Sequence, residues 1–225
     1  MNHESVKKVI ILGTGGNCID ILESLLDINA GLSTKLYDIQ GFLDDDPKKQ
    51  NHKIDGFPVL GSLKDAARYE DCYFVNGIGS INNYWRRKEI VESTNISKDR
   101  FISVVHPTSY ISSSAKLGVG VVVFQQATIT NHVVMGDFVV ILPQSILSHD
   151  VVIGDYTCIA GGVNISGGAQ VGALSFLGSG ASVIGSINIG SKSLVGLGSV
   201  VLKDVPDNVV VAGVPARIIR ATIEG

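Results

Sequence analysis

A strict six-residue period in the second half of this chain constrains its fold more than any other feature. From residue 105 to residue 201, every sixth position carries Val, Ile, Leu or Met. An α-helix would repeat every 3.6 residues and an ordinary strand every two, so neither explains the pattern. A six-residue repeat instead predicts a short strand followed by a corner, with the aliphatic side chain pointing inward. The seventeen positions are Val105, Ile111, Leu117, Val123, Ile129, Met135, Ile141, Leu147, Ile153, Ile159, Ile165, Val171, Leu177, Val183, Ile189, Val195 and Val201.

Glycine and small side chains recur at two other places in the repeat. Glycine often follows the aliphatic residue, where we expect it to permit the turn. The residue four places after the aliphatic one is usually small, which lets it fit beside the inward side chain. Three faces would close one triangular coil of 18 residues, so residues 105–225 are predicted to form a parallel β-helix of about five to six coils. The glycines are Gly118, Gly136, Gly154, Gly172, Gly178, Gly190 and Gly196, and the small residues are Thr157, Ala169, Ser175, Ala181, Ser193 and Ser199.

The first 104 residues follow a different pattern, in which short apolar runs alternate with helix-like stretches. This alternation predicts a small parallel sheet of Rossmann type. The whole chain is therefore predicted to be α/β plus β-helix, with a Rossmann-like domain at residues 1–104 and the β-helix domain at residues 105–225. The expected strands are Val6–Gly13, Ile39–Leu43 and Cys72–Ile78, the expected helices are Asn17–Asp27 and Tyr84–Ser93, and Phe101–Val105 begins the next element.

Composition excludes several classes of protein. The 18 basic and 21 acidic residues give a formal net charge of −3, which offers no electrostatic footprint for nucleic acid or an acidic membrane surface. The apolar run Val9–Leu12 is too short for a signal peptide or a membrane span, so we expect a cytoplasmic protein. The cysteines Cys18, Cys72 and Cys158 lie far apart, which argues against a disulfide framework or a zinc site.

Candidate ligand-binding residues follow the predicted strands of the first domain. Gly13-Thr14-Gly15-Gly16 lies between a strand and a helix, where backbone amides and the helix N-terminus can hold a diphosphate. A plain tight turn is the alternative interpretation. Asp44 and Asp45 follow the second strand, where an acidic side chain can meet a base or a ribose, or can simply be a solvated turn. Gly79 follows the third strand and would let the same ligand approach closely.

His149 and Asp150 are the candidate catalytic residues. His149 lies two places after the inward Leu147, so it should face outward near a corner. An imidazole can remove a proton from an attacking amine or hydroxyl, and a neighbouring carboxylate raises its basicity. Gly167 follows His149 by one 18-residue coil, so we expect the two to stack. In a reaction on a thioester, the Gly167 N–H would then be a donor to the carbonyl oxygen.

At this point the motifs resemble a known family. The hexapeptide repeat, Ser148–Asp155 (SHDVVIGD) and Lys203–Arg217 (KDVPDNVVVAGVPAR) resemble bacterial sugar acyltransferases of the left-handed β-helix superfamily. The GTGG, FLDDD and NGIGS segments ahead of the repeat resemble the NeuD/PglD-type sugar acetyltransferases. The resemblance implies a left-handed coil, a homotrimer with active sites between subunits, and acetyl-CoA as co-substrate without a metal. It also implies an N-acetyltransferase that acts on a UDP-, dTDP- or GDP-linked amino sugar in the synthesis of surface polysaccharide or glycoconjugates.

The resemblance also assigns roles to individual residues. It implies that the Gly13–Gly16 loop holds the nucleotide sugar, that Asp44 and Asp45 lie beside the base, and that His149 and Asp150 are the base and its partner. Cys158 stands where one relative type has a second His at the acyl-CoA, so Cys158 is expected to line that site or to act as a nucleophile. The acetyl-CoA-binding residues implied in this way are Cys158, Gly167, Ser179 and Leu197.

Three other functions fit parts of the sequence. An O-acetyltransferase of a free sugar such as sialic acid would need no nucleotide. A zinc enzyme would need His106, His132 and His149 to converge, although only the second interval approaches one coil. A non-catalytic scaffold would leave His149 without a role. The segment Tyr84-Trp85-Arg86-Arg87 is expected to begin a surface helix, with Trp85 packing inward, or else to contact a phosphate.

Overall fold

The apolar run near the N-terminus forms the central strand of a small parallel sheet. In the computed structural model, which describes residues 5–222, β1 (Lys7–Leu12) lies between β2 (Tyr37–Leu43) and β5 (Tyr73–Asn76). Val9–Leu12 is completely buried, as expected for a strand covered on both faces. The three predicted strands are therefore confirmed, in the spatial order β2-β1-β5.

One long helix packs against both this sheet and the first strand of the second half of the chain. The helix α1 (Gly16–Ala30) begins at the glycine loop after β1 and buries Ile21, Leu22 and Leu25. The second predicted helix divides into a 3₁₀ turn, Tyr84–Arg86, and α2 (Arg87–Glu92). Elements that the sequence did not indicate are the hairpin β3 (Lys53–Ile54) and β4 (Phe57–Pro58) and the 3₁₀ helices Leu63–Arg68 and Lys98–Arg100.

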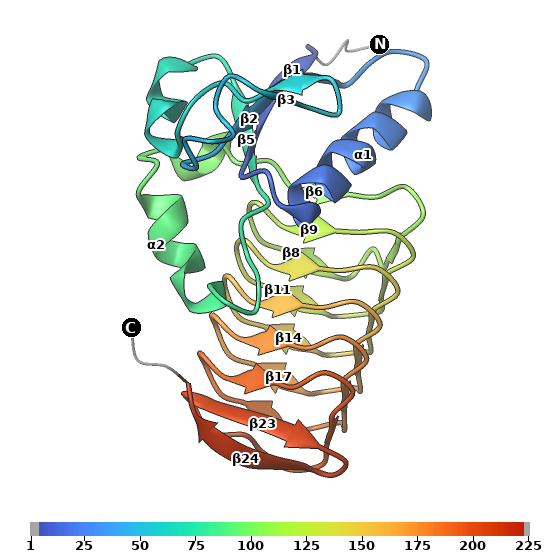
Figure 1. Ribbon diagram of the computed structural model, residues 1–225. Helices are drawn as coiled ribbons and strands as arrows, with labels where there is room; N and C mark the ends of the chain where they lie inside the picture. The colour runs from blue at the N-terminus through green and yellow to red at the C-terminus, as the bar shows by residue number, and fades with distance from the viewer. Residues whose placement is uncertain (1–4, 223–225) are drawn as a thin grey trace.

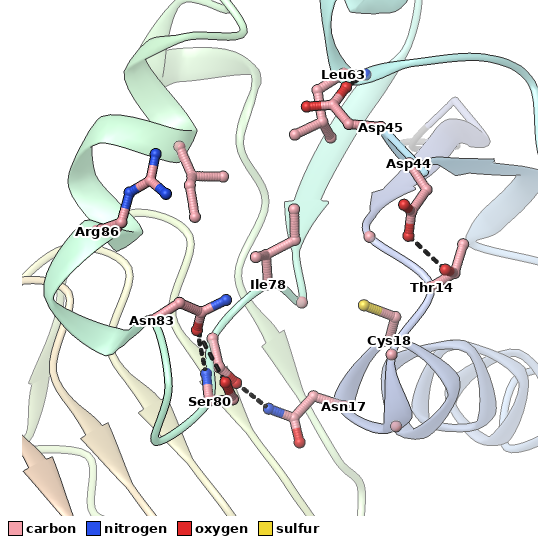
Figure 2. A pocket seen from close by; sticks show the side chains of 16 residues that line it. Thr14, Asn17, Cys18, Asp44, Asp45, Leu63, Ile78, Ser80, Asn83 and Arg86 are labelled. Atoms are coloured by element: carbon pink, nitrogen blue, oxygen red, sulfur yellow. Dashed lines mark hydrogen bonds between the residues drawn. The ribbon is translucent and has the colours of Figure 1, made fainter. Parts of the chain in front are cut away.

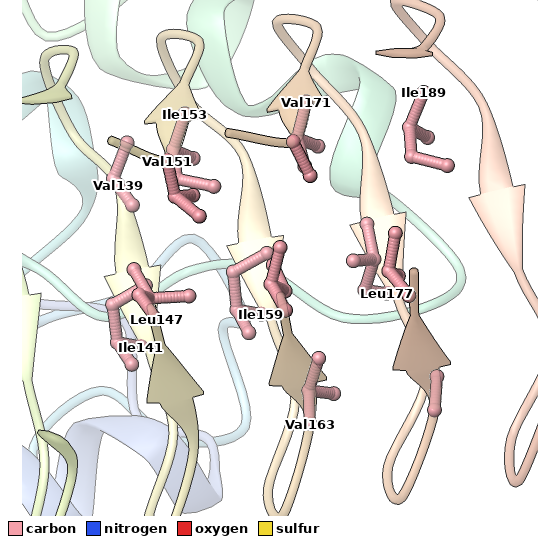
Figure 3. Close-up of a cluster of buried hydrophobic side chains, with 14 of the residues drawn as sticks. Val139, Ile141, Leu147, Val151, Ile153, Ile159, Val163, Val171, Leu177 and Ile189 are labelled. Atoms are coloured by element: carbon pink, nitrogen blue, oxygen red, sulfur yellow. The ribbon is translucent and has the colours of Figure 1, made fainter. Parts of the chain in front are cut away.

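The six-residue repeat forms a parallel β-helix, which confirms the predicted fold class (Figure 1). Each two-residue strand ends on one of the seventeen periodic aliphatic residues, and these side chains fill the interior of the coil (Figure 3). The strands stack into three parallel sheets, headed by β6, β7 and β8. The strands are β6 (Val104–Val105), β7 (Tyr110–Ile111), β8 (Lys116–Leu117), β9 (Val122–Val123), β10 (Thr128–Ile129), β11 (Val134–Met135), β12 (Val140–Ile141), β13 (Ile146–Leu147), β14 (Val152–Ile153), β15 (Cys158–Ile159), β16 (Asn164–Ile165), β17 (Gln170–Val171), β18 (Phe176–Leu177), β19 (Ser182–Val183), β20 (Asn188–Ile189), β21 (Leu194–Val195) and β22 (Val200–Val201).

The corners correct one expectation about glycine. The left-handed backbone conformation falls on the third residue after the aliphatic one, at every repeat from Gly120 to Gly198, and not on the residue that follows it directly. Most of these left-handed positions carry side chains, Asp150 among them with φ 61°. Glycine directly after the strand has another cause, because a Cβ at Gly118 or Gly154 would lie well under 3.0 Å from the backbone of the next coil. The small residues four places on are buried, as predicted.

The N-terminal region covers one of the three faces of the β-helix. On the sheet that contains β6, β12, β15 and β18, the outward residues are buried, including Val140, Cys158 and Phe176. On the other two faces the outward apolar residues Ile146 and Val152 stay about 40% exposed, at 41% and 39%. The face carrying Cys158 is therefore the one brought against the Rossmann-like sheet and its loops.

The far end of the β-helix is closed by a hairpin of longer strands. β23 (Val209–Gly213) pairs in parallel with β21, and β24 (Ala216–Ala221) pairs antiparallel with β23. Within residues 5–222, no helix is long and apolar enough to cross a membrane. The division into residues 1–104 and 105–225 remains a prediction, and β6 lies across it.

Candidate active site

The glycine loop after β1 forms one side of a cavity of about 550 Å³ (Figure 2). Helix α1 begins at Gly16, and in the described structure no side chain caps its N-terminus. A Cβ at Gly15 or Gly16 would have no atom within 4 Å, so both residues border open space. Uncapped amides that face a cavity are a ready site for an anionic group. Gly13 differs, because its φ of 94° and its contact with Ile78 require glycine for packing.

The two predicted acidic residues border the same cavity but are held differently. Asp44 accepts hydrogen bonds from the Thr14 hydroxyl and from the Asp46 N–H, and Lys49 Nζ lies 3.5 Å from it. Asp44 therefore fixes the glycine loop. Asp45 accepts the Leu63 N–H through Oδ1 at 2.9 Å. Its second carboxylate oxygen has no partner among residues 5–222, so it is the acidic group available to a ligand.

The loop after β5 forms the opposite side of the cavity. The Asn17 amide donates to the Gly79 carbonyl oxygen at 3.1 Å, which joins the start of α1 to this loop. Ser80 is held by Asn83 Oδ1, which accepts its backbone N–H at 2.7 Å. The structure thus brings all seven predicted substrate-binding residues to one cavity. They are Gly13, Thr14, Gly15, Gly16, Asp44, Asp45 and Gly79.

A second cavity, of about 280 Å³, adjoins the first on the β-helix. The two cavities share Asn17, Gly79 and Ser80 in their walls, so they are neighbours across the loop after β5. Three of the four predicted acetyl-CoA-binding residues line the second cavity, namely Cys158, Ser179 and Leu197. Its remaining walls are apolar, and they come from Ile81, Leu142, Ala160 and Phe176.

His149 and Asp150 lie at the corner between β13 and β14. His149 Nδ1 is 2.8 Å from Asp150 Oδ2, and both side chains are more than half exposed. An ionised carboxylate only accepts, so this contact assigns the proton to Nδ1 and leaves the Nε2 lone pair free. The hydrogen bond from His149 lowers the pKa of Asp150 below its usual range. This arrangement suits an imidazole that acts as a proton acceptor.

Gly167 lies directly against His149, one coil further on. A Cβ at Gly167 would lie well under 3.0 Å from Cε1 and Nε2 of the imidazole, so only glycine leaves the ring in this position. Among the described residues, the backbone N–H of Gly167 donates no hydrogen bond, whereas Gly168 donates to the His149 carbonyl at 2.9 Å. The Gly167 amide is therefore free for a ligand beside the imidazole.

A single chain does not unite these two groups of residues. The second cavity lies at the corner that follows strands β12, β15 and β18. His149 and Gly167 lie at the next corner of the triangle, which follows strands β13 and β16. His149, Asp150 and Gly167 line neither cavity. The predicted base and the predicted acyl-CoA pocket thus occupy different corners of one β-helix.

Two alternative roles find no matching geometry. Burial raises the pKa of Cys158 to about 11, so its thiol is neutral near pH 7 and a poor nucleophile. His106 is bound to Asp27 through Nε2 at 3.0 Å, and it lies at a different corner of the β-helix from His132 and His149. Within the described part of the chain, no three His, Cys, Asp or Glu side chains are grouped to hold a metal ion.

Sequence reasoning assigned no binding role to three residues of this region. Asn17, Ser80 and Asn83 shape the cavities. Asn17 directly follows the GTGG loop and Ser80 ends the NGIGS segment, so their place in these motifs was the available signal, whereas Asn83 has no such context. Arg86 lines the first cavity, in line with the phosphate-contact interpretation of its segment.

Arg87 was expected on a surface helix, and this expectation was wrong, because the side chain is 1% exposed. Its guanidinium donates to the carbonyl oxygens of Ile78 and Tyr156, which ties the loop after β5 to the β-helix.

Known protein families match both halves of the chain. The PglD N-terminal domain matches residues 8–94, and the bacterial transferase hexapeptide repeat matches residues 132–167. No curated protein matches the chain. The structure is similar to the acetyltransferase domain of PglB from Neisseria gonorrhoeae FA1090, with 28% identity, a TM-score of 0.83, and coverage of 95% of this chain and 100% of that one.

Two further structures have the same two-part architecture. One is perosamine N-acetyltransferase from Caulobacter crescentus, in a variant that has asparagine in place of a histidine and that is in complex with CoA and GDP-perosamine. Its sequence identity to this chain is 29% and the TM-score is 0.81, with coverage of 95% of this chain and 97% of that one. The other is WeeI from Acinetobacter baumannii AYE, with 25% identity, a TM-score of 0.78 and coverage of 95% and 100%. The two family models and these structures therefore confirm the predicted resemblance to acyltransferases that carry a PglD-type N-terminal domain and a hexapeptide repeat.

Proposed function

We propose that this protein is an acetyl-CoA-dependent N-acetyltransferase that acts on a nucleotide-linked amino sugar. The observation that carries the proposal is the pair of adjoining cavities. Every residue predicted to hold the nucleotide sugar lines one of them, and three residues predicted to hold acetyl-CoA line the other. The perosamine N-acetyltransferase, which has the same architecture, is in complex with both CoA and GDP-perosamine.

The nucleotide part of the acceptor would occupy the first cavity. Its diphosphate would approach the uncapped amides at Gly15 and Gly16, where the positive end of α1 favours an anion. The free oxygen of Asp45 would accept a hydrogen bond from an N–H of the base. The sugar would then extend past Gly79 and Ser80 towards the β-helix, because these residues border both cavities.

The chemical step would take place at His149. Nε2 would accept a proton from the sugar amine while the amine nitrogen attacks the thioester carbon. The negative charge that develops on the carbonyl oxygen would be stabilised by the Gly167 N–H. Collapse of this intermediate breaks the carbon–sulfur bond, and the imidazolium returns its proton to the departing CoA sulfur. Acetyl-CoA supplies the activated acetyl group, and Asp150 holds the imidazole and stabilises its charged form.

The active site would lie between subunits of a homotrimer. One chain presents its base and its acyl-CoA pocket at different corners, so a second chain has to bring the two together. The two faces not covered by the N-terminal region expose apolar side chains that such an assembly would bury. These are Tyr110, Val134, Ile146 and Val152, which are 60%, 39%, 41% and 39% exposed.

Nucleotide binding by calorimetry tests the assignment of the first cavity. We expect one of UDP, dTDP and GDP to bind the wild-type protein. Gly15→Ala, which places a methyl group in open space beside the amides, should weaken that binding at least about tenfold. Gly31→Ala at the other end of α1 is the matched control, because its Cβ would make only ordinary contacts at 3.6 Å, and it should bind normally. Absence of binding by all three nucleotides would favour O-acetylation of a free sugar instead.

A further inference from the structure

A second imidazole contacts the carboxylate that holds His149. His132 Nδ1 lies 3.5 Å from Asp150 Oδ1, while His149 Nδ1 lies 2.8 Å from Asp150 Oδ2. Each carboxylate oxygen therefore faces one histidine. All three side chains are exposed to a similar extent, with His132 at 65%, Asp150 at 57% and His149 at 62%. The Asp150 carboxylate is thus shared between two imidazoles.

The coil period produces this arrangement. His132 precedes Asp150 by 18 residues, which is one coil, and both have the left-handed backbone of the corner, with φ of 59° and 61°. The His132 N–H donates to Ser114 Oγ at 3.0 Å, so the coil before it also supports its backbone. Stacked side chains on successive coils lie about 5 Å apart, which holds the two groups in register.

Few other charges act on this cluster. The coil before His132 presents Ser112, Ser113 and Ser114 at this corner, and the coil after Asp150 presents Gly167 and Gly168, none of which titrates. The next charged groups along the corner are Lys203 and Asp204, three coils beyond His149 and Asp150 and hence about 14 Å away. Among the described residues, His149 and His132 are the charged side chains that act on the Asp150 carboxylate. The adjoining face adds Lys116, whose strand pairs with Val134, two residues after His132.

We propose that His132 is a positioning residue that acts through Asp150 and sets the pH range in which His149 serves as a base. This inference rests on the proposed function. A protonated His132 competes for the Asp150 carboxylate and repels a protonated His149, so it disfavours protonation of His149 as the pH falls. Without His132, Asp150 would serve His149 alone and the repulsion would vanish. The pKa of His149 would rise, and the base would be lost at a higher pH.

Two substitutions at His132 separate this electrostatic role from a structural one. His132→Gln removes the second imidazole and should move the acid limb of kcat/KM to higher pH by about half a unit, with little change in the rate at the alkaline plateau. His132→Arg keeps a permanent cation and should leave the acid limb at or below its wild-type position. His52→Gln, at an exposed position in the N-terminal region, is the control and should move nothing. Equal behaviour of the Gln and Arg variants would overturn the proposal.

The same coupling can be measured without turnover. The imidazole NMR titration of His149 should give a higher pKa in the Gln variant than in the wild type and no higher a pKa in the Arg variant. His149→Asn identifies the resonance by its loss. Because the titration needs no substrate, it tests the influence of His132 on His149 even if the protein has another activity. A negative result in the titration therefore counts against this inference alone, and not against the proposed function. An unchanged His149 titration in the Gln variant would refute the inference.

Discussion

At the residue scale, His149 contacts two very different neighbours. Asp150 holds its Nδ1 at 2.8 Å, and Gly167, which has no side chain, leaves room for the imidazole beside Nε2. The outward direction of His149 and its stacking on Gly167 were predictable, because the six-residue period dictates both. The contact between His132 and Asp150 follows from the same 18-residue spacing, yet the sequence suggested His132 only as a zinc ligand.

Replacing His149 should abolish most of the activity. His149→Ala removes the proposed proton acceptor, so we expect turnover to fall by about 10²- to 10⁴-fold. Thiol release from acetyl-CoA measures the effect, and size-exclusion chromatography should give an unchanged assembly. His52→Ala is the control, since His52 is exposed and lines neither cavity. Near-normal turnover by the His149 variant would exclude the assigned role.

A single methyl group at Gly167 should have a similar but smaller effect. Gly167→Ala would force the imidazole out of position, so we expect kcat to fall by about 10- to 100-fold. Gly161→Ala is a matched control at the same point of the repeat, where the nearest atom to the new Cβ is 3.4 Å away. Steady-state kinetics gives kcat for both variants. Equal kcat values would show that the close contact between Gly167 and His149 has no effect on turnover.

At the scale of elements, the period predicted the β-helix strands well because every inward side chain fills the same space in every coil. The hairpin β3–β4 was not predictable, since its strands have only two residues each and carry no periodic signal. Burial of Arg87 was not predictable either. Its strongest contact is with the Tyr156 carbonyl, 69 residues away in the sequence, and no local pattern reports such a contact.

Arg87 should therefore be important for stability in a way that its neighbours are not. Arg87→Ala leaves a cavity and removes hydrogen bonds from a buried cation to Ile78 and Tyr156, so we expect a loss of about 2–4 kcal/mol. Lys88→Ala, which removes only an exposed pair with Glu92 at 3.8 Å, should cost less than about 1 kcal/mol. Thermal or denaturant unfolding distinguishes the two variants, and equal losses would contradict this role for Arg87.

At the scale of the whole molecule, the predicted site residues separate into two groups. The first cavity adjoins the second one, whereas His149 lies at the next corner of the triangle. The sequence predicted the residues of the first cavity and the stacking of Gly167 on His149, because motifs and spacing are local. It grouped Gly167 with the acetyl-CoA-binding residues Cys158, Ser179 and Leu197, whereas the structure places Gly167 at the corner of His149. The resemblance implied active sites between subunits, and this separation within one chain agrees with that expectation.

Mixed trimers test whether the two groups meet between subunits. His149→Ala removes the base, and Ser179→Trp should fill the second cavity from an exposed position. Each variant alone should be inactive. When the two variants are co-expressed in equal amounts, about one quarter of the wild-type activity should return. Each site needs an intact His149 from one chain and an intact cavity from its neighbour, and random assembly meets each of these two conditions in about half of the cases. Persistent inactivity of the mixture would place the whole site within one chain.

The most direct test of the proposed function is a thiol-release assay with acetyl-CoA and a panel of UDP-, dTDP- and GDP-linked amino sugars. Mass spectrometry of each product reports whether one acetyl group has been added and where it is attached. We expect one nucleotide sugar to gain a single acetyl group on nitrogen, with release of one CoA thiol. Folded protein that binds CoA yet acetylates no member of the panel, while it acetylates a free sugar on oxygen, would contradict the proposal.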